Sequence, residues 1–326
     1  MRAIQITELS GPATALRLAE VPEPRDGHEM TPGAGVLIDV HAAGVSFPEL
    51  LQTRGRYQLQ PELPFIPGSE VGGIVREVNG SAAVKPGDRV AAFCGLAGWA
   101  QTAVAPGYFT FRIPDRWDFA QGAALVLNYH TAYFALIERG RLSDGETVLV
   151  HGAAGGVGTA VLQVAGALGA RTIAVVSTDE KAEVARRAGA AEVLRSDGPW
   201  KDQARELGGV DIVIDPVGGD RFTDSLRSLR EGGRLVVVGF TAGSIPEVRV
   251  NRLLLGNTEI VGAGWGSSVI GWPERTERIG AAIGPLIDSG AIEPIIGGRF
   301  PLASAAEALE LLEGRGATGK VVLDVA

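Results

Sequence analysis

The first 118 residues carry short, β-branched apolar runs separated by glycine and proline, a pattern that predicts strands rather than helices. A short helix is expected over 47–54. Strands are expected at 36–45, 73–78, 89–93, 100–104 and 109–113. Many short strands at close spacing indicate an all-β, barrel-like domain.

The apolar spacing changes near residue 119, where a helix is expected over 119–139. Strands and helices then alternate, which predicts a doubly wound parallel sheet. Its strands are expected at 147–151, 171–176, 192–194, 210–214, 234–238 and 258–261. After a helix running from 272 to 290, the pattern predicts a strand, a helix and a strand at 295–300, 303–313 and 320–325. We therefore expect two domains, residues 1–118 with 266–326, and residues 119–265.

A glycine-rich turn follows the first strand of the predicted parallel sheet. Gly155, Gly156, Val157 and Gly158 open a helical apolar pattern, and a second strand follows that helix. Strand, glycine turn, helix and strand form the βαβ unit of a dinucleotide site, where a diphosphate approaches backbone N–H groups at a helix N-terminus. The alternative is a tight turn without a ligand. Position 153, where the first glycine of the usual fingerprint falls, is alanine.

The residues after the second strand bear on the choice of nucleotide. NAD-binding folds place a carboxylate at this strand end, but here the strand ends at Ser177 and Thr178. A hydroxyl followed by Lys181 suits a 2′-phosphate, which a carboxylate would repel. We therefore expect NADPH rather than NADH, with Arg186 and Arg195 as further cations. The alternatives are a capping box over 177–180 and a solvated Lys181.

Other strand ends of the predicted sheet border the same crevice, because ligands of open α/β sheets bind at the carboxyl ends of the strands. One strand ends in Asp215-Pro216-Val217-Gly218-Gly219 and another in Gly239-Phe240. Ordinary βα turns are the alternative. His151 directly precedes the glycine turn. It has either a cofactor-facing role or a packing role.

Composition narrows the classes of function. The 326 residues carry a formal net charge of −8, which argues against nucleic acid or an anionic membrane as a partner. No apolar run approaches the roughly 20 residues needed to span a bilayer. Cys94 is the single cysteine, and none of the four histidines has metal-ligand spacing. No GxSxG nucleophile elbow is present. We expect a cytoplasmic protein without a bound metal.

Several segments together resemble the zinc-independent medium-chain dehydrogenases/reductases of the quinone oxidoreductase-like (zeta-crystallin-like) branch. The resemblance extends over essentially the whole chain. The segments that carry it are AAGVSFPE at 42–49, RGRY at 54–57, PGSEVGGIV at 67–75, TAY at 131–133, AAGGVG at 153–158 and GKVVL at 319–323. Zinc-dependent relatives have a histidine ligand at the position of Ser69, and their cysteine-rich structural lobe is missing here.

The resemblance implies a GroES-like catalytic domain, a Rossmann domain and NADPH as cofactor. It further implies reduction of a quinone or an α,β-unsaturated carbonyl, usually by a homodimer. The residues implied in cofactor binding are Gly155, Gly156, Val157 and Gly158 for the diphosphate, Ser177 and Lys181 for the 2′-phosphate, Thr131, Gly239 and Phe240 near the nicotinamide, and Lys320 from the C-terminal segment. Tyr57 is expected to face the substrate.

Three positions depart from the pattern of the family. Ser46 replaces an asparagine near the reactive end of the cofactor, Glu49 replaces an aspartate, and Ser196 replaces a tyrosine near the adenosine phosphate, where Arg195 can compensate. Tyr57 or Ser46 is expected to stabilise the charge that develops on the substrate oxygen. The alternatives are a non-catalytic NADPH-binding protein, a zinc-free enoyl reductase acting on acyl thioesters, and a zinc-free alcohol dehydrogenase.

Overall fold

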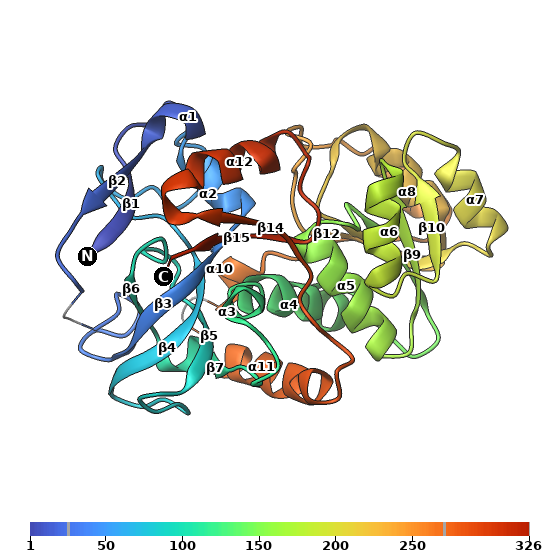
Figure 1. The fold of residues 1–326 in the computed structure, drawn as a ribbon. Coiled ribbons are helices and arrows are strands. Elements are labelled where there is room, and N and C mark those ends of the chain that lie inside the picture. The colour runs from blue at the N-terminus through green and yellow to red at the C-terminus, as the bar shows by residue number, and fades with distance from the viewer. Residues whose placement is uncertain (25–26, 270–271, 326) are drawn as a thin grey trace. The chain divides into compact units, whose positions relative to one another are not determined.

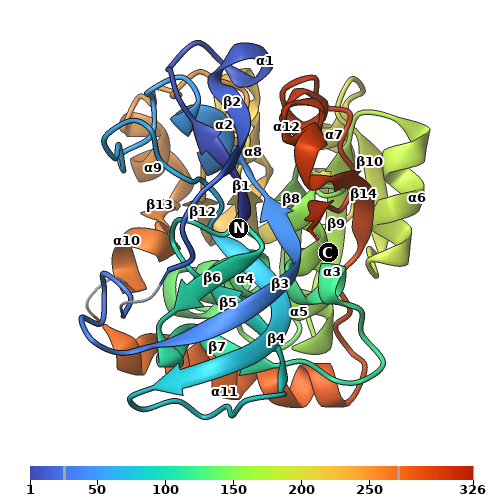
Figure 2. The same cartoon turned by 60° about the vertical axis from the view of Figure 1, so that its left-hand side comes forward.

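The structure is a computed structural model that describes residues 1–24, 27–269 and 272–325 (Figures 1 and 2). The chain divides into two compact units. Residues 1–127, 270–280 and 294–326 form the first unit, and residues 128–269 and 281–293 form the second. The domain boundaries expected at 118/119 and 265/266 stay a prediction, because units of contact need not coincide with domains.

The first unit is built around a seven-stranded sheet, with strand order β14-β15-β3-β4-β5-β7 and β6 paired to β3. A separate antiparallel pair, β1 and β2, was not expected from the sequence. The strands are β1 (Arg2–Ile6), β2 (Leu16–Glu20), β3 (Gly35–Val45), β4 (Glu70–Asn79), β5 (Arg89–Phe93), β6 (Thr102–Ala105), β7 (Thr110–Arg112), β14 (Ile296–Pro301) and β15 (Lys320–Asp324). The helices are α1 (Pro12–Ala15), α2 (Phe47–Gln52), η1 (Gly107–Phe109), α3 (Phe119–Gly122), η4 (Leu302–Ser304) and α12 (Ala305–Glu313).

The second unit contains a six-stranded parallel sheet with the order β10-β9-β8-β11-β12-β13. This is the Rossmann order, so the predicted doubly wound sheet is confirmed. Its strands are β8 (Thr147–His151), β9 (Arg171–Val176), β10 (Glu192–Arg195), β11 (Val210–Asp215), β12 (Leu229–Val237) and β13 (Glu259–Gly262). Its helices are η2 (Phe134–Arg139), α5 (Gly156–Ala167), α6 (Asp179–Arg187), α7 (Trp200–Glu206), η3 (Gly219–Arg221), α8 (Phe222–Ser228), α9 (Asn251–Gly256) and α10 (Trp265–Val269). Helices α4 (Val126–Tyr133) and α11 (Pro273–Asp288) span the boundaries between the units.

Every residue of β8 is buried, as expected for a central strand of a parallel sheet with both faces covered. Strand order reverses between β8 and β11, which places the glycine turn after β8 at the topological switch point. Open α/β sheets bind their ligands at this point. The fold therefore puts the segment with the dinucleotide pattern where such a ligand is expected.

The expected helix over 119–139 is wrong as a single element, because α3, α4 and the π-helix η2 share this stretch. Asp118 caps α3 by accepting the N–H of Gln121. The N–H of Leu127, in the first turn of α4, donates to the Glu70 carboxylate over 2.9 Å. A partner distant in sequence thus satisfies the new helix start, which local periodicity does not reveal.

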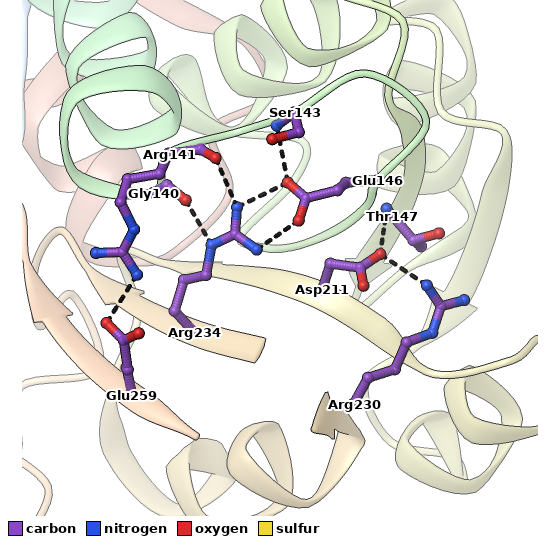
Figure 3. A network of polar contacts seen from close by, with 9 residues as sticks. All are labelled: Gly140, Arg141, Ser143, Glu146, Thr147, Asp211, Arg230, Arg234 and Glu259. Atoms are coloured by element: carbon purple, nitrogen blue, oxygen red, sulfur yellow. Dashed lines mark hydrogen bonds and ion pairs between the residues drawn. The ribbon is translucent and has the colours of Figure 1, made fainter. Parts of the chain in front are cut away.

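A buried arginine joins the loop before β8 to strand β12 (Figure 3). Arg234 donates to both carboxylate oxygens of Glu146 over 2.6 and 2.7 Å, and to the carbonyl oxygens of Gly140 and Arg141. Hydrogen bonds to Arg234, together with the N–H of Ser143, hold the pKa of Glu146 below its usual value although burial alone would raise it. This network lies at the amino ends of the strands. It stabilises the end of the sheet that is opposite the glycine turn.

Candidate functional site

The glycine turn of the second unit leads directly into helix α5. Gly155 is the N-cap of this helix, so the first N–H groups of α5, at Gly156, Val157 and Gly158, have no partner within the helix. A Cβ atom on Gly158 would lie 2.2 Å from the carbonyl oxygen of Gly152, whereas one on Gly155 would meet nothing closer than 3.4 Å. Gly158 therefore permits close packing of the turn, and Gly155 leaves room in front of the helix. This geometry is compatible with the expected anion site, which stays a prediction.

The residues expected around a 2′-phosphate come together at the ends of β9 and β10. Lys181 Nζ lies 3.3 Å from Ser177 Oγ, and Arg195 donates to the Ser177 carbonyl oxygen over 2.7 Å. The N–H of Ser196 donates to the carbonyl oxygen of Val176. Arg195 also forms an exposed ion pair with Asp179. Two cations thus contact the exposed Ser177, Lys181 at its hydroxyl and Arg195 at its carbonyl oxygen.

The alternative interpretation, a capping box over 177–180, places the cap one residue too early. Thr178 is the N-cap of α6, and its hydroxyl accepts the N–H of Lys181. Helix α6 begins at Asp179 because the threonine has the extended backbone of a cap. The side chain of Ser177 is consequently not the cap of α6, and its hydroxyl accepts from Lys181 instead.

The remaining residues of the second unit that are expected to bind the cofactor lie on separate elements. Thr131 is buried in α4, and Gly239 and Phe240 follow β12. The N–H of Gly239 donates weakly to the Asp215 carbonyl oxygen, at 3.4 Å, so this segment runs beside the end of β11. The Asp215 side chain accepts the N–H groups of Val217 and Gly218, and burial raises its pKa. These contacts bring the two expected strand ends together.

A buried polar cluster lies in the first unit around Lys320, the first residue of β15. Lys320 Nζ lies 2.6 Å from Ser46 Oγ and 2.5 Å from Glu70 Oε1. The side chains of Lys320 and Glu70 are 4% and 1% exposed, whereas Ser46 is only half-buried. An ammonium group is therefore held by a buried carboxylate and directed at the hydroxyl of a half-buried serine.

Glu49 extends this cluster from helix α2. Its carboxylate accepts the N–H of Ser46 over 2.9 Å and both the N–H and the hydroxyl of Ser69, over 3.0 and 2.5 Å. Burial raises the pKa of Glu49, although the Ser69 hydrogen bond and the Lys320 charge oppose this. Burial and the nearby Glu49 also raise the pKa of the half-buried Tyr57. Ser46 and Tyr57 thus belong to one region of the first unit.

Sequence reasoning did not identify Glu70 or Ser69 as parts of this cluster, nor that Glu49 joins them. Glu70 and Lys320 are far apart in the sequence, and no local spacing connects them. The only signal was that Ser69 and Glu70 stand in the same short segment, PGSEVGGIV, that carried the family resemblance.

His151 has a packing role. The Ser225 hydroxyl donates to the Arg221 carbonyl oxygen over 3.0 Å, so Ser225 Oγ accepts the Nε2–H of His151 over 2.8 Å. Its ring also makes an edge contact with Trp200. Burial lowers the pKa of His151 to about 3, which keeps the ring neutral. His151 therefore fixes the end of β8 from behind the glycine turn.

Cys94 is buried, as expected of a small apolar residue, and burial raises the pKa of its thiol to about 12. Among the residues that the structure describes, no group of three or more His, Cys, Asp or Glu side chains is arranged to hold a metal ion. Over the same residues, no helix has the length and apolar character required to cross a membrane. Cytoplasmic localisation stays a prediction.

Family models match both parts of the chain. Residues 32–115 match the alcohol dehydrogenase GroES-like domain, and residues 156–280 match a family described as zinc-binding dehydrogenase. The GroES-like and Rossmann assignments made from the sequence are thereby confirmed.

Curated relatives match over nearly the whole chain. The bovine quinone oxidoreductase-like protein 2 is 39% identical over 99% of this chain and 92% of its own length. The human quinone oxidoreductase is 36% identical over 99% of this chain and 97% of its own. A mycobacterial protein solved in complex with NADPH is 36% identical, with a TM-score of 0.90 and complete coverage of both chains. The chain therefore belongs to the quinone oxidoreductase branch of the medium-chain dehydrogenases/reductases.

Proposed function

We propose that this protein is an NADPH-dependent oxidoreductase that transfers hydride, without zinc, to a quinone or an α,β-unsaturated carbonyl compound. The observation that carries the proposal is the Lys320–Ser46 contact, because it supplies a positively charged hydrogen-bonding system that can stabilise charge on a substrate oxygen. The relatives named quinone oxidoreductase support the same reaction class.

The expected use of NADPH is supported by the surroundings of Ser177. Lys181 and Arg195 contact this residue, and both cations favour a phosphate over a ribose hydroxyl. The backbone N–H groups at the start of α5 suit the diphosphate. The complex of the mycobacterial relative with NADPH is consistent with this assignment. We further propose that Thr131, Gly239 and Phe240 contribute to cofactor binding, whereas the ammonium group expected there from Lys320 is instead held by Glu70 and Ser46.

Bound NADPH would supply the hydride, so the protein needs no covalent nucleophile. Negative charge then develops on the oxygen of the substrate carbonyl or quinone. Ser46 and Tyr57 carry hydroxyl groups that can donate to this oxygen. Water or one of these hydroxyls donates the proton that completes the product.

The absence of zinc from the reaction is supported by the chemistry of Ser69 and Ser46. The Ser69 hydroxyl donates to Glu49 and takes the position of a histidine ligand in zinc-dependent relatives. The Lys320 ammonium group next to Ser46 would repel a divalent cation. A zinc ion is consequently unfavourable beside these residues.

The proposal is tested by stopped-flow measurement of NADPH oxidation with a panel of quinones and enones, with and without a zinc chelator. We expect oxidation of NADPH that the chelator leaves unchanged. Tight NADPH binding without turnover of any acceptor would instead support the non-catalytic NADPH-binding protein. An acyl-thioester enone and a primary alcohol with NADP⁺ belong in the panel, because they distinguish the enoyl reductase and the alcohol dehydrogenase.

We also propose a homodimer formed through the β13 edge of the sheet. Strand β13 ends the strand order, and nearby apolar side chains are exposed, with Leu254 and Leu255 of α9 at 75% and 80%. An unpaired strand edge beside apolar side chains favours association with a second copy. Light scattering of the protein should give twice the mass of the chain, and Leu254→Asp/Leu255→Asp should give the monomer mass. A monomeric parent protein would contradict this.

A further inference from the structure

We propose that the buried pair Glu70–Lys320 makes the Ser46 hydroxyl a charge-assisted hydrogen-bond donor to the substrate oxygen, so that Ser46 rather than Tyr57 stabilises the developing oxyanion. This inference rests on the proposed reductase function. It assigns Ser46 as a catalytic residue, and Lys320 and Glu70 as positioning residues.

The hydrogen-bond directions around Ser46 carry the argument. The Lys320 ammonium group can only donate, so Ser46 Oγ accepts from it over 2.6 Å. The N–H of Ser46 donates to Glu49, which fixes the backbone at the start of α2. Among the residues that the structure describes, no side chain or carbonyl accepts the hydroxyl proton of Ser46. That proton is therefore available to an incoming oxygen.

Glu70 determines where the ammonium group points. One of its carboxylate oxygens binds Lys320 and the other accepts the N–H of Leu127. The Glu70 carboxylate is fully buried and hydrogen-bonded at both oxygens, so it cannot move together with the Lys320 side chain. The lysine therefore stays in place, and its positive charge acts through Ser46. Preorganised charge of this kind stabilises an oxyanion because no reorganisation accompanies the reaction.

Tyr57 is less suited to the same task. Burial, and in second place the Glu49 carboxyl group, raises the pKa of Tyr57 and disfavours negative charge at its hydroxyl. The Glu49 carboxylate itself is occupied by three donors, from Ser46 and Ser69. Negative charge near Ser46 is instead compensated by Lys320. The two hydroxyls of this region thus differ in the charge beside them.

Ser46→Ala removes the donor and leaves the Glu70–Lys320 pair intact. At saturating NADPH we expect kcat for quinone reduction to fall about 10²-fold, with little change in NADPH affinity. The loss of kcat should be larger for quinones whose hydroquinone oxyanion is more basic. A loss of folded structure would not produce this dependence. Ser46→Thr, which keeps a hydroxyl, should recover most of the rate. The exposed Ser10→Ala serves as the matched control.

Lys320→Met/Glu70→Gln removes the positioning pair without leaving an unpaired buried charge. Its kcat should fall as well, and adding Ser46→Ala to it should cause little further loss, because the pair acts through Ser46. If the kcat losses of Ser46→Ala and of the double variant multiply in full in the triple variant, the proposal is overturned. A Ser46→Ala protein whose kcat stays within threefold of the parent value for every quinone would also overturn it.

A spectroscopic measurement tests the donor without turnover. 4-Nitrophenolate resembles the hydroquinone anion in charge, and its absorption differs from that of the neutral 4-nitrophenol. We expect the parent protein to bind phenolate roughly 10- to 100-fold more tightly than Ser46→Ala does, in the range of a charge-assisted hydrogen bond. Equal affinities would refute the donor role. If no quinone or enone is reduced but this difference persists, the reductase function fails while the donor assignment stands.

Discussion

The ammonium group of Lys320 lies 2.5 Å from the carboxylate of Glu70, and both side chains are almost completely buried. Lys320 begins β15 and Glu70 begins β4, and β3 pairs with both strands. The pair therefore joins the C-terminal strand to the centre of the sheet. Its stability is governed by desolvation, because a charge at such a site is costly unless its partner is present.

Lys320→Met should lower the free energy of unfolding by about 3–5 kcal/mol, because it leaves the Glu70 carboxylate buried without its counter-ion. Lys320→Met/Glu70→Gln should recover part of this loss, since the uncompensated charge is removed. Urea unfolding followed by circular dichroism measures both values. A double variant as unstable as the single one would show that packing of the lysine stem, rather than charge, accounts for the loss.

The glycine turn offers a pair of matched substitutions. Gly158→Ala should destabilise the protein by about 1–3 kcal/mol, because its Cβ atom would clash with the Gly152 carbonyl oxygen at 2.2 Å. Gly155→Ala should keep its stability, because Gly155 has a φ of −84° and its Cβ atom would meet nothing closer than 3.4 Å.

NADPH titration of these variants separates packing from binding. The Kd of Gly155→Ala should rise by about tenfold or more, equivalent to 1.4 kcal/mol, because the methyl group occupies space in front of the helix. Unchanged NADPH affinity of Gly155→Ala would indicate that the diphosphate does not bind at this turn.

The sequence was sufficient to predict most strands, the parallel sheet and the glycine turn, because these depend on apolar periodicity and local glycine chemistry. Strand 171–176 and the start of α5 lie within one residue of expectation. The alternative that made Ser177 a helix cap fails because Thr178 is the N-cap, and two consecutive hydroxyl residues satisfy the same local pattern.

What the sequence could not predict depends on contacts between distant residues. The helix over 119–139 is interrupted where Leu127 finds the Glu70 carboxylate, and β1 is stabilised by pairing with β2 across an intervening helix. The polar cluster of the first unit joins three segments, around Ser46, Glu70 and Lys320. Its individual members were visible in the sequence, but their hydrogen bonds were not.

The protein should lose stability on mild acidification partly through His151. Its pKa is lowered from 6.5 to about 3 by burial, so between these two pH values the unfolded chain binds a proton that the folded chain does not. Above pH 6.5 the contribution of His151 to the free energy of unfolding is therefore fully present. Below pH 6.5 this contribution falls as the pH decreases, by at most about 1.4 kcal/mol per pH unit. Below about pH 3 this contribution no longer changes.

His151→Gln tests this dependence, because a glutamine amide can still donate to Ser225 but does not titrate. Urea unfolding between pH 7 and 4.5 should show a shallower loss of stability in the variant than in the parent. Parallel curves for the two proteins would mean that His151 does not remain neutral in the folded state.

Selectivity for NADPH should depend on the residues that surround Ser177. Ser177→Asp should weaken NADPH binding and leave or improve NADH binding, because a carboxylate repels the 2′-phosphate and accepts ribose hydroxyls. Lys181→Ala should also reduce the NADPH preference, by about tenfold, since one charge-assisted contact is lost. Fluorescence titration with both nucleotides measures the ratio of the dissociation constants.

Arg186→Ala is the matched control for Lys181→Ala, because it removes a cation from the same helix. Arg186 forms an exposed ion pair with Glu183, so its charge is directed along α6. We expect this variant to retain the NADPH preference of the parent. If Arg186→Ala and Lys181→Ala reduce the preference equally, selectivity reflects the net charge of the helix rather than a phosphate site at Ser177.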